Sequence, residues 1–519
     1  MTEQWRLLAS LRQWSAIAQE ATRRWLGHQE TLGRVPRRRL AAPTPDNRGV
    51  ARTVVGVEEY SGLNELAFAS LWLLVFTIPW EDAVTIPGFG TSARLIGMAT
   101  VGLGVLAIIE RGKVRRPAAG HILMALFVMM AAVSYLWSLY PEGTVVQALS
   151  YIQLFAMVWL IWELAPRARD QLRLMQAYVF GTIISGIDTL YLFFSHQESV
   201  YQRYAGARLD ANDLGLIMAL SIPMSYYLLI QNKGRMAWVY RLQLVLAGTT
   251  VLLTASRGAT LASVVALAIV PLTLARLTAR QRIAVVLTVS VLVCAALLFV
   301  PSSSWERLST MPNEFERGTF TGRTVIWTAG WEIFRAHPFL GIGANAFRII
   351  VSRVLAEPIR PGEHDPAPPA HNTFLSVLVE QGVIGFTLFC ALLGVLAVSL
   401  KAMPRFPRRL WIVSLGVWVV GVSSLTWEMR KPTWFFFGLI MAQCGSMAQK
   451  RLDVETPPRY FQGSLTHMRA FQSWGFLMRR PGRRLFSRAI SVRVFREVSG
   501  ILNAILTAGM RVDRRSAAQ

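Results

Sequence analysis

The sequence predicts an all-α, polytopic integral membrane protein with about twelve transmembrane helices, and three observations support this prediction. Of its 519 residues, 53% are hydrophobic and 16% are charged, and the mean hydropathy is +0.39. Apolar runs long enough to span a bilayer recur along the chain. Basic residues gather in alternate connections between these runs. This composition is not that of a soluble globular protein.

A polar and basic extension, residues 1–62, is expected to precede the first span. It includes Arg37-Arg38-Arg39 and lacks the short apolar core and cleavage site of a signal peptide. Between Trp5 and Leu26 it has apolar residues at helical spacing among arginines. This part either lies on the inner membrane surface or forms a plain solvated helix.

The transmembrane domain is expected over residues 63–448. Each apolar run within it can cross the hydrocarbon core as a helix. The expected spans are approximately 65–80, 94–110, 121–139, 145–164, 174–194, 214–230, 241–255, 259–278, 283–300, 372–400, 409–426 and 433–448.

The basic residues orient these spans. They fill the connections near 111–116, 167–173, 233–241, 276–282 and 401–409, all on the side shared with the two ends of the chain. The positive-inside rule then places both termini in the cytoplasm. The net charge of +24 is explained in this way, and no nucleic-acid partner is expected.

The C-terminal tail, residues 449–519, is also basic, and Arg484 to Met510 alternates arginines with apolar residues. This spacing suits a helix that lies at the membrane interface, with a regulatory or anchoring role.

The three cysteines, Cys294, Cys390 and Cys444, fall within apolar runs. They are expected to be small core hydrophobes, because their spacing fits neither a disulfide framework nor a metal site. No metal is expected, since no cluster of carboxylates demands one.

Five cationic candidates fall on the opposite, outer side: Arg203, Arg208, Arg257, Arg323 and His371. The positive-inside rule favours arginine on the cytoplasmic side of the membrane. A set of cations on the outer side therefore indicates a function that keeps them there. Arginine presents a planar donor fork that suits phosphate oxygens. A lipid diphosphate at the membrane edge is therefore the expected ligand, although each arginine on its own could also be snorkelling to the headgroups.

The stretch from His371 to Gly385 begins at the end of a polar loop and enters an apolar run. On a continuous helix, Gly382 and Gly385 would lie on the face below His371 and admit a close neighbouring helix, while Glu380 would point the opposite way. An acid inside an apolar helix calls for a polar partner or a watery cavity. The alternative is that His371 and Asn372 only cap a helix.

The largest outer loop is expected over residues 301–371. Within it, Val325 to Phe334 has amphipathic helical character, and Gly341 to Phe347 resembles a glycine turn that opens a second short helix.

Several motifs in this half of the chain occur together and carry a family resemblance. They are Gly322-Arg323-Thr324-Val325-Ile326-Trp327, His337-Pro338-Phe339-Leu340-Gly341-Ile342-Gly343-Ala344-Asn345-Ala346-Phe347, His371-Asn372 with nine residues before Gly382-Val383-Ile384-Gly385, Ser256-Arg257-Gly258, Arg203 to Gly206, and Asn212, Leu214 and Gly215. Jointly they resemble the O-antigen ligase and polymerase superfamily, by motif over about residues 200–385.

The resemblance implies a multi-pass glycosyltransferase of the bacterial inner membrane whose active site faces the periplasm. Such enzymes transfer a glycan from undecaprenyl diphosphate to an acceptor hydroxyl, on the lipid A core or on a growing glycan, without a nucleotide sugar, a metal or another cofactor. Membrane lipids are the expected surroundings.

The resemblance also suggests roles for individual residues. His371 would be the general base, and Arg257 and Arg203 would neutralise the departing diphosphate. Arg323 would position the diphosphate or the large loop, with Arg208 as a further candidate. Asn372, Glu380, Gly382 and Gly385 would support the site.

Two questions remain open from the sequence. The shared motifs serve both ligases and polymerases, with a slight lean toward a ligase. A polysaccharide-lipid transporter or flippase also has about twelve spans, but it keeps polar sites near the midplane, where only Gln153, Asp188 and Glu380 are candidates. A non-catalytic scaffold would leave the ordered outer motifs unexplained.

Overall fold

The computed structural model describes residues 62–86, 90–196, 203–274, 278–299, 305, 309, 323–355 and 369–455. The chain divides into residues 1–61 and 62–519, so all described residues belong to the second unit. Residues 1–61 of the N-terminal extension, residues 484–510 and parts of the expected loop 301–371 lie outside the described residues.

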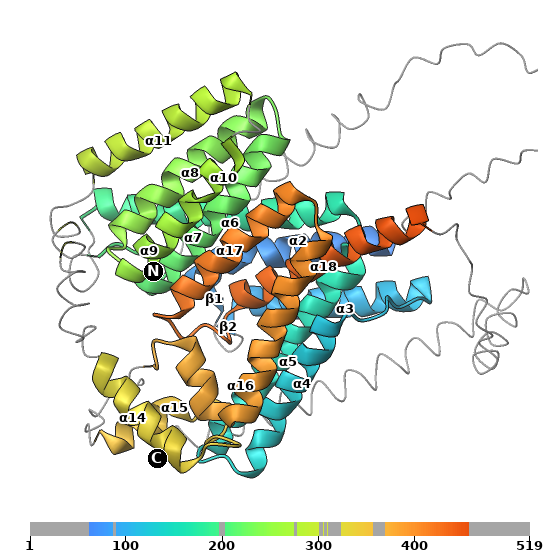
Figure 1. Ribbon diagram of the computed structural model, residues 1–519, viewed down its shortest axis with the longest axis vertical. Helices are drawn as coiled ribbons and strands as arrows, with labels where there is room; N and C mark the ends of the chain where they lie inside the picture. Colours follow the sequence, from blue (N-terminus) through green and yellow to red (C-terminus); the bar gives the residue numbers. More distant parts are fainter. Residues whose placement is uncertain are drawn as a thin grey trace, which may run out of the picture. The chain divides into compact units, whose positions relative to one another are not determined.

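The described residues are predominantly helical, as the sequence predicts (Figure 1). The helices are α2 (Gly62–Thr77), α3 (Ser92–Arg111), α4 (Ala119–Val133), α5 (Pro141–Leu164), α6 (Ala168–Phe194), α7 (Ala211–Gln231), α8 (Arg235–Leu253), α9 (Arg257–Leu267), α10 (Ile269–Leu274), α11 (Ala279–Phe299), α14 (Arg323–Ala336), α15 (Phe347–Val354), α16 (Thr373–Ser399), α17 (Arg405–Val422) and α18 (Lys431–Glu455). Short 3-10 turns are η1 (Ile78–Ala83), η2 (Ser134–Leu136) and η4 (Leu400–Ala402). β1 (Thr85–Ile86) pairs antiparallel with β2 (Gly90–Thr91).

Each of the twelve expected spans overlaps a helix, but fewer have the length and composition of a membrane span. Within the described residues, eight helical segments are long and apolar enough to cross a membrane. They are Gly62–Ala83, Ser92–Arg111, Ala119–Leu136, Pro141–Leu164, Ala168–Phe194, Ala211–Gln231, Arg235–Leu253 and Thr373–Ala402. The protein is therefore a multi-span membrane protein, and the count of twelve remains a prediction.

The expected span 259–278 is not one continuous helix. It is divided into α9 and α10 at Ala268, and the whole apolar segment Arg257–Thr273 is short. Pro271 explains the break, because proline lacks an amide hydrogen and its ring clashes with the carbonyl four residues earlier.

Helix α7 lies at the centre of the described helices. In the most apolar stretch of 18 residues in α7, 89% of the residues are buried. Helix α7 packs against α6, α8, α9 and α17. Asp210 caps its N-terminus, with a carboxylate oxygen that accepts a hydrogen bond from the Asn212 amide at 2.8 Å. A Cβ added at Gly215 would lie 2.5 Å from the Ala259 Cβ, so this glycine lets α9 start directly against α7.

Helix α16 is broken at Gly382, whose φ of 63° and ψ of −170° are not helical. The break leaves backbone carbonyls of α16 without their partners within the helix. The segment after α14 supplies hydrogen-bond donors for them. The amides of Ile342 and Gly343 donate to the carbonyls of Val379 and Glu380, at 3.1 and 2.9 Å. The polar backbone groups of the two segments thereby form hydrogen bonds with each other, and they are not left unpaired.

The same docking continues on the other side of the break, where the Val383 amide donates to the Pro338 carbonyl at 2.9 Å. The fit requires glycine on both sides. A Cβ at Gly382 would lie 2.2 Å from the Phe339 carbonyl oxygen, and one at Gly341 would lie 2.4 Å from the Glu380 oxygen. Two separate sequence motifs thus form one structural unit.

The expected short helices of the large loop are present as α14 and α15. Ile326, Ala329 and Ile333 from α14 pack with Phe347 from α15 and with Val379 from α16 in a small apolar cluster. Figure 1 shows both helices, in yellow, beside the first part of α16. They are therefore fixed close to His371.

The expectation for the cysteines is wrong for two of the three. Cys294 and Cys390 are exposed on their helices, and only Cys444 is buried. An apolar run places a residue in the membrane, but in a multi-span protein that residue can face lipid as easily as protein.

Candidate functional site

A charged cavity of about 610 Å³ opens where the N-terminal ends of α7 and α16 meet α15 and the connection between α17 and α18. Its volume is typical of a small-molecule site. Its charged lining residues are Glu81, Asp82, Asp210, Asp213, Glu380, Glu428, Arg348, His371, Arg430 and Lys431. Such walls suit a hydrophilic ligand.

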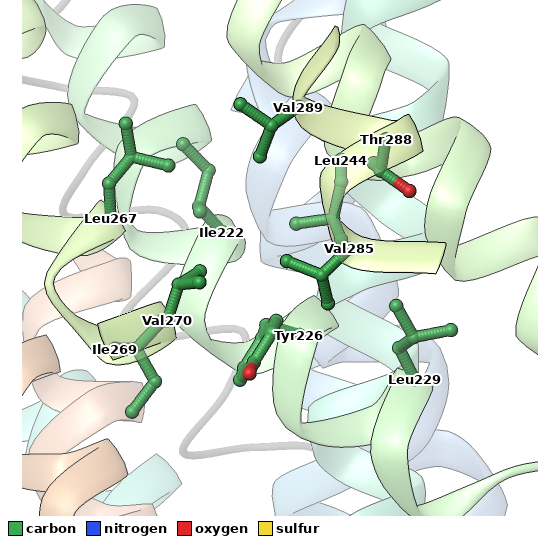
Figure 2. Close-up of a pocket in the computed structure, with 10 residues that line it drawn as sticks. All are labelled: Ile222, Tyr226, Leu229, Leu244, Leu267, Ile269, Val270, Val285, Thr288 and Val289. Carbon is green, nitrogen blue, oxygen red and sulfur yellow. The ribbon is translucent and has the colours of Figure 1, made fainter. Parts of the chain in front are cut away.

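A second, smaller cavity of about 50 Å³ has a different character (Figure 2). It is lined almost wholly by aliphatic side chains from α7, α8, α9, α10 and α11, such as Ile222, Leu244 and Val285. Tyr226 in its wall is 13 positions beyond Asp213, about 20 Å further along α7 at 1.5 Å per residue. This apolar cavity lies toward the opposite end of α7 from the charged cavity and is unsuited to a charged headgroup.

His371 lines the charged cavity directly before α16, with a left-handed φ of 47°. Its Nδ1 is buried, and no described residue offers it a hydrogen-bond partner. Burial, followed by the nearby positive charges of Arg323 and Arg348, lowers the pKa of His371 to about 4, and Asp210 partly opposes this. The imidazole is therefore neutral at pH 7 and can accept a proton.

Asn372 is the cap that the alternative interpretation of this stretch proposed. Its side-chain oxygen accepts a hydrogen bond from the Leu375 amide at 3.1 Å at the start of α16. The helix begins at Thr373, so His371 stands outside it. The cap fixes the backbone from which His371 extends.

The prediction that Glu380 points away from His371 is wrong, because both residues line the same cavity. The helical-wheel argument assumed one continuous helix through His371, Glu380 and Gly385, whereas α16 starts after His371 and breaks at Gly382. Glu380 is 6% exposed and accepts a hydrogen bond from the Phe347 amide at 3.3 Å. It therefore joins α16 to α15.

The expected helix contact at Gly382 and Gly385 is also corrected. At Gly382 the close neighbour is the loop segment that contains Phe339, and at Gly385 it is Gln381 of the same helix. Gly382 serves a helix break rather than the packing of two helices.

Arg203 does not line the charged cavity. Its Nε donates to the Thr254 carbonyl, and its terminal nitrogen donates to the Asn212 side chain, both at 2.8 Å. It thereby ties the loop before α7 to the turn before α9. Arg257 is the half-buried first residue of α9 on that same turn.

The turn that carries Arg257 nevertheless adjoins the site. A Cβ at Gly258 would lie 2.2 Å from the Ser424 hydroxyl, and the next residues, Leu425 and Thr426, line the cavity. Arg208 has an exposed side chain and a φ of 56°. Of the five predicted cations, the structure brings His371 and Arg323 together, places Arg257 on the adjoining turn, and places Arg203 on the loop that is bonded to that turn.

Residues 242–390 match a family model described as O-Antigen ligase. This match supports the assignment to the O-antigen ligase and polymerase superfamily that the motifs indicate. No curated protein matches the chain. The matched region includes Arg257, Arg323, His371 and Glu380. Similarity to this family implies, in general terms, a glycosyltransferase-like membrane protein that acts on lipid-linked glycans.

Sequence reasoning missed the connection between α17 and α18. Arg430 pairs with Asp213 at 2.5 Å, and Lys431 pairs with Glu81. Glu428 is 3% exposed and accepts a hydrogen bond from the Ser376 hydroxyl at 2.7 Å. Arg430 and Lys431 also fall on the expected outer side, so the argument that selected the other arginines could have found them.

The site also holds Arg348, which lines the cavity in the first turn of α15 and acts on His371 electrostatically. Nothing in the sequence separates it from other arginines. Within the described part of the chain, no group of three His, Cys, Asp or Glu side chains is placed to hold a metal ion. Metal independence remains a prediction.

Proposed function

We propose that this protein transfers a glycan from undecaprenyl diphosphate to an acceptor hydroxyl on the periplasmic face of the bacterial inner membrane. The preferred reaction is that of an O-antigen ligase, with the lipid A core as acceptor. Joining of repeat units by a polymerase would use the same chemistry at the same site.

The observation that carries this proposal is the environment of His371. It lines a charged cavity, its buried Nδ1 has no partner among the described residues, and its low pKa of about 4 keeps it neutral at pH 7. A neutral imidazole in a charged cavity is available to accept a proton from a bound substrate.

In the proposed reaction, His371 accepts the proton of the acceptor hydroxyl as its oxygen attacks the anomeric carbon of the donor glycan. A new carbon–oxygen glycosidic bond forms, and the bond from the anomeric carbon to the phosphate oxygen breaks. Undecaprenyl diphosphate leaves with the electron pair.

Cations near His371 stabilise the charge on this leaving group. Arg323 and Arg348 are close enough to lower the pKa of His371, Arg257 lies on the adjoining turn, and Arg203 is bonded to that turn. Preorganised donors of this kind each contribute about 3 to 4 kcal/mol to a transition state. Arg323 and Arg257 are assigned to the diphosphate, Arg203 holds the turn in place, and Arg208 remains a further candidate.

The test is the surface-polysaccharide profile of a strain that lacks this gene and is complemented with wild type or His371→Ala. We expect wild type to restore the profile and His371→Ala to accumulate normally in the membrane without restoring it. His337→Ala is the matched control, because this exposed histidine is not part of the cavity lining. Full restoration by His371→Ala would disprove the assignment of the base.

The profile also separates the possible reactions. Loss of all O-polysaccharide from the lipid A core, with long chains on the lipid carrier, identifies a ligase. Cores with at most one repeat unit identify an O-antigen polymerase. Intact lipopolysaccharide together with a lost exopolysaccharide identifies a polymerase of another pathway.

A flippase would need polar groups within the membrane that are available to a substrate. Of the three candidates, the Asp188 carboxylate accepts a hydrogen bond from the Ala207 amide at 2.6 Å, Gln153 is exposed on α5, and Glu380 lines the charged cavity. Consumption of lipid-linked glycan by the purified protein in detergent, where no transport is possible, distinguishes an enzyme from a flippase.

A further inference from the structure

The floor of the charged cavity contains buried polar atoms that lack partners. Gln147 on α5 is 2% exposed, Glu428 is 3% exposed, and both line the cavity. No described residue donates a hydrogen bond to Gln147 Oε1 or Glu428 Oε2. Leaving buried polar atoms unsatisfied costs about 1 to 3 kcal/mol each, so such atoms in a cavity wall indicate a polar ligand.

Glu380 lies in the same cavity wall as Gln147 and Glu428. It lines the cavity, and its carboxyl group lies close enough to that of Glu428 to interact with it electrostatically. The second oxygen of each group is held in place, Glu428 Oε1 by the Ser376 hydroxyl and Glu380 Oε1 by the Phe347 amide. The acceptors are therefore fixed before any ligand arrives.

Different groups of the cavity interact with one another. Arg323 and Arg348 act on His371, Glu380 and Glu428 interact with each other, and Arg430 and Lys431 pair with Asp213 and Glu81. A phosphate group fits best beside the arginines that act on His371, because arginine is permanently charged. The ligand of the acidic region must therefore offer hydrogen-bond donors and carry no negative charge.

Burial raises the pKa of Glu428, which favours its uncharged form. A hydroxyl group can donate to a carboxylate and can also accept from a carboxylic acid, so it pairs with Glu428 in either state. A cation requires the charged form. Hydroxyl groups therefore fit this wall better than a cation does.

We propose that Gln147, Glu380 and Glu428 form a subsite that binds the hydroxyl groups of a sugar ring. The inference deepens the proposed function and rests on it. It separates sugar recognition, by the acceptor-rich wall, from diphosphate recognition, by the arginines near His371.

Binding of a free sugar tests the subsite without any transfer reaction. The probe is the repeat-unit oligosaccharide released by mild acid from the lipid-linked glycan of the native strain, added to the purified full-length protein. We expect wild type to bind it and Gln147→Leu to bind about tenfold more weakly, the effect of one net hydrogen bond. Glu428→Gln keeps an amide oxygen and should lose less.

Gln381→Leu is the matched control. Gln381 is also a buried glutamine, it has no hydrogen-bond partner among the described residues, and it neighbours Glu380, but it does not line the cavity. This variant should bind the oligosaccharide as wild type does. Thermal unfolding without ligand and binding of inorganic pyrophosphate show whether Gln147→Leu retains its fold, and both should be unchanged.

The proposal is overturned if wild type does not bind the oligosaccharide, or if Gln147→Leu binds it with wild-type affinity. It stands if Gln147→Leu alone loses binding, even where His371→Ala retains transfer, and the two proposals can therefore fail separately. In the transfer assay, a raised KM for the lipid-linked donor would assign the sugar ring to the donor. A raised KM for the acceptor would assign it to the acceptor.

Discussion

The proposed role of His371 depends on the groups around it rather than on its place in a motif. Outside the helix and partly buried, it interacts electrostatically with Arg323, Arg348 and Asp210. Burial and the two arginines favour the neutral form more than Asp210 favours the charged form, so the pKa falls. A base of this kind stays available well into the acidic range.

This environment predicts the pH dependence of transfer. In the proposed reaction the neutral form of His371 is the active one, and its pKa is about 4, so the rate should remain constant down to about pH 5 and fall below it. Arg348→Gln removes a positive charge that lowers this pKa, so its acidic limb should move to higher pH. The pH profile of kcat/KM measures both.

Arg335→Gln provides the control for the pH shift, because Arg335 is exposed on α14 and is not among the groups that act on His371. The acidic limb of the pH profile of Arg335→Gln should coincide with that of wild type. A wild-type limb near pH 6.5 would contradict the assignment of this step to a buried His371.

At the scale of elements, the broken helix α16 is the central feature. The break at Gly382 frees backbone groups inside an apolar helix, and the turn that contains Gly341 binds them. Unpaired backbone groups are expensive in a membrane, so neither part is stable without the other. This unit fixes α14 and α15, and with them Arg323 and Arg348, beside His371.

We therefore predict that Gly382→Ala is strongly destabilising. Alanine at a φ of 63° is strained, and its Cβ would lie 2.2 Å from a backbone oxygen. The loss should be at least about 2 kcal/mol of unfolding free energy. Chemical unfolding in mixed detergent micelles would measure it.

Gly394→Ala in the same helix is the control, since a Cβ there meets no atom within 4 Å. Its stability should equal or slightly exceed that of wild type, because alanine favours a helix by about 1 kcal/mol over glycine. Equal stability of the two variants would show that the break at Gly382 is not needed.

At the scale of the whole molecule, the cavity joins segments that are far apart in the sequence. Asp213 at the start of α7 accepts hydrogen bonds from Trp427, at 2.7 Å, and from Arg430, at 2.5 Å. Lys431 reaches back to Glu81. These contacts hold the connection between α17 and α18 against the first and central helices.

The positive-inside rule predicts on which face of the membrane this end lies. In a variant without the three native cysteines, Glu332→Cys on α14 should react with a membrane-impermeant maleimide in cells whose outer membrane has been permeabilised. Lys113→Cys, after α3, should react only once the inner membrane is opened. Both side chains are exposed, so a reversed pattern would place the cavity in the cytoplasm.

The sequence by itself determined the class of the protein, its helices and its superfamily. Hydropathy and charge are summed over twenty residues at a time, so local errors cancel, and α14 and α15 were predicted because their periodicity is local. The motifs around Arg257, Arg323 and His371 could be identified for the same reason.

The tertiary structure alone decided how these motifs work together. No local pattern indicates that Glu380 shares a cavity with His371, that Arg203 holds a turn, or that Glu428 and Arg348 belong to the site. Each depends on contacts across long stretches of chain and on a helix that breaks at Gly382. A period of 3.6 residues describes a continuous helix, and the site is built where the helices begin, break and end.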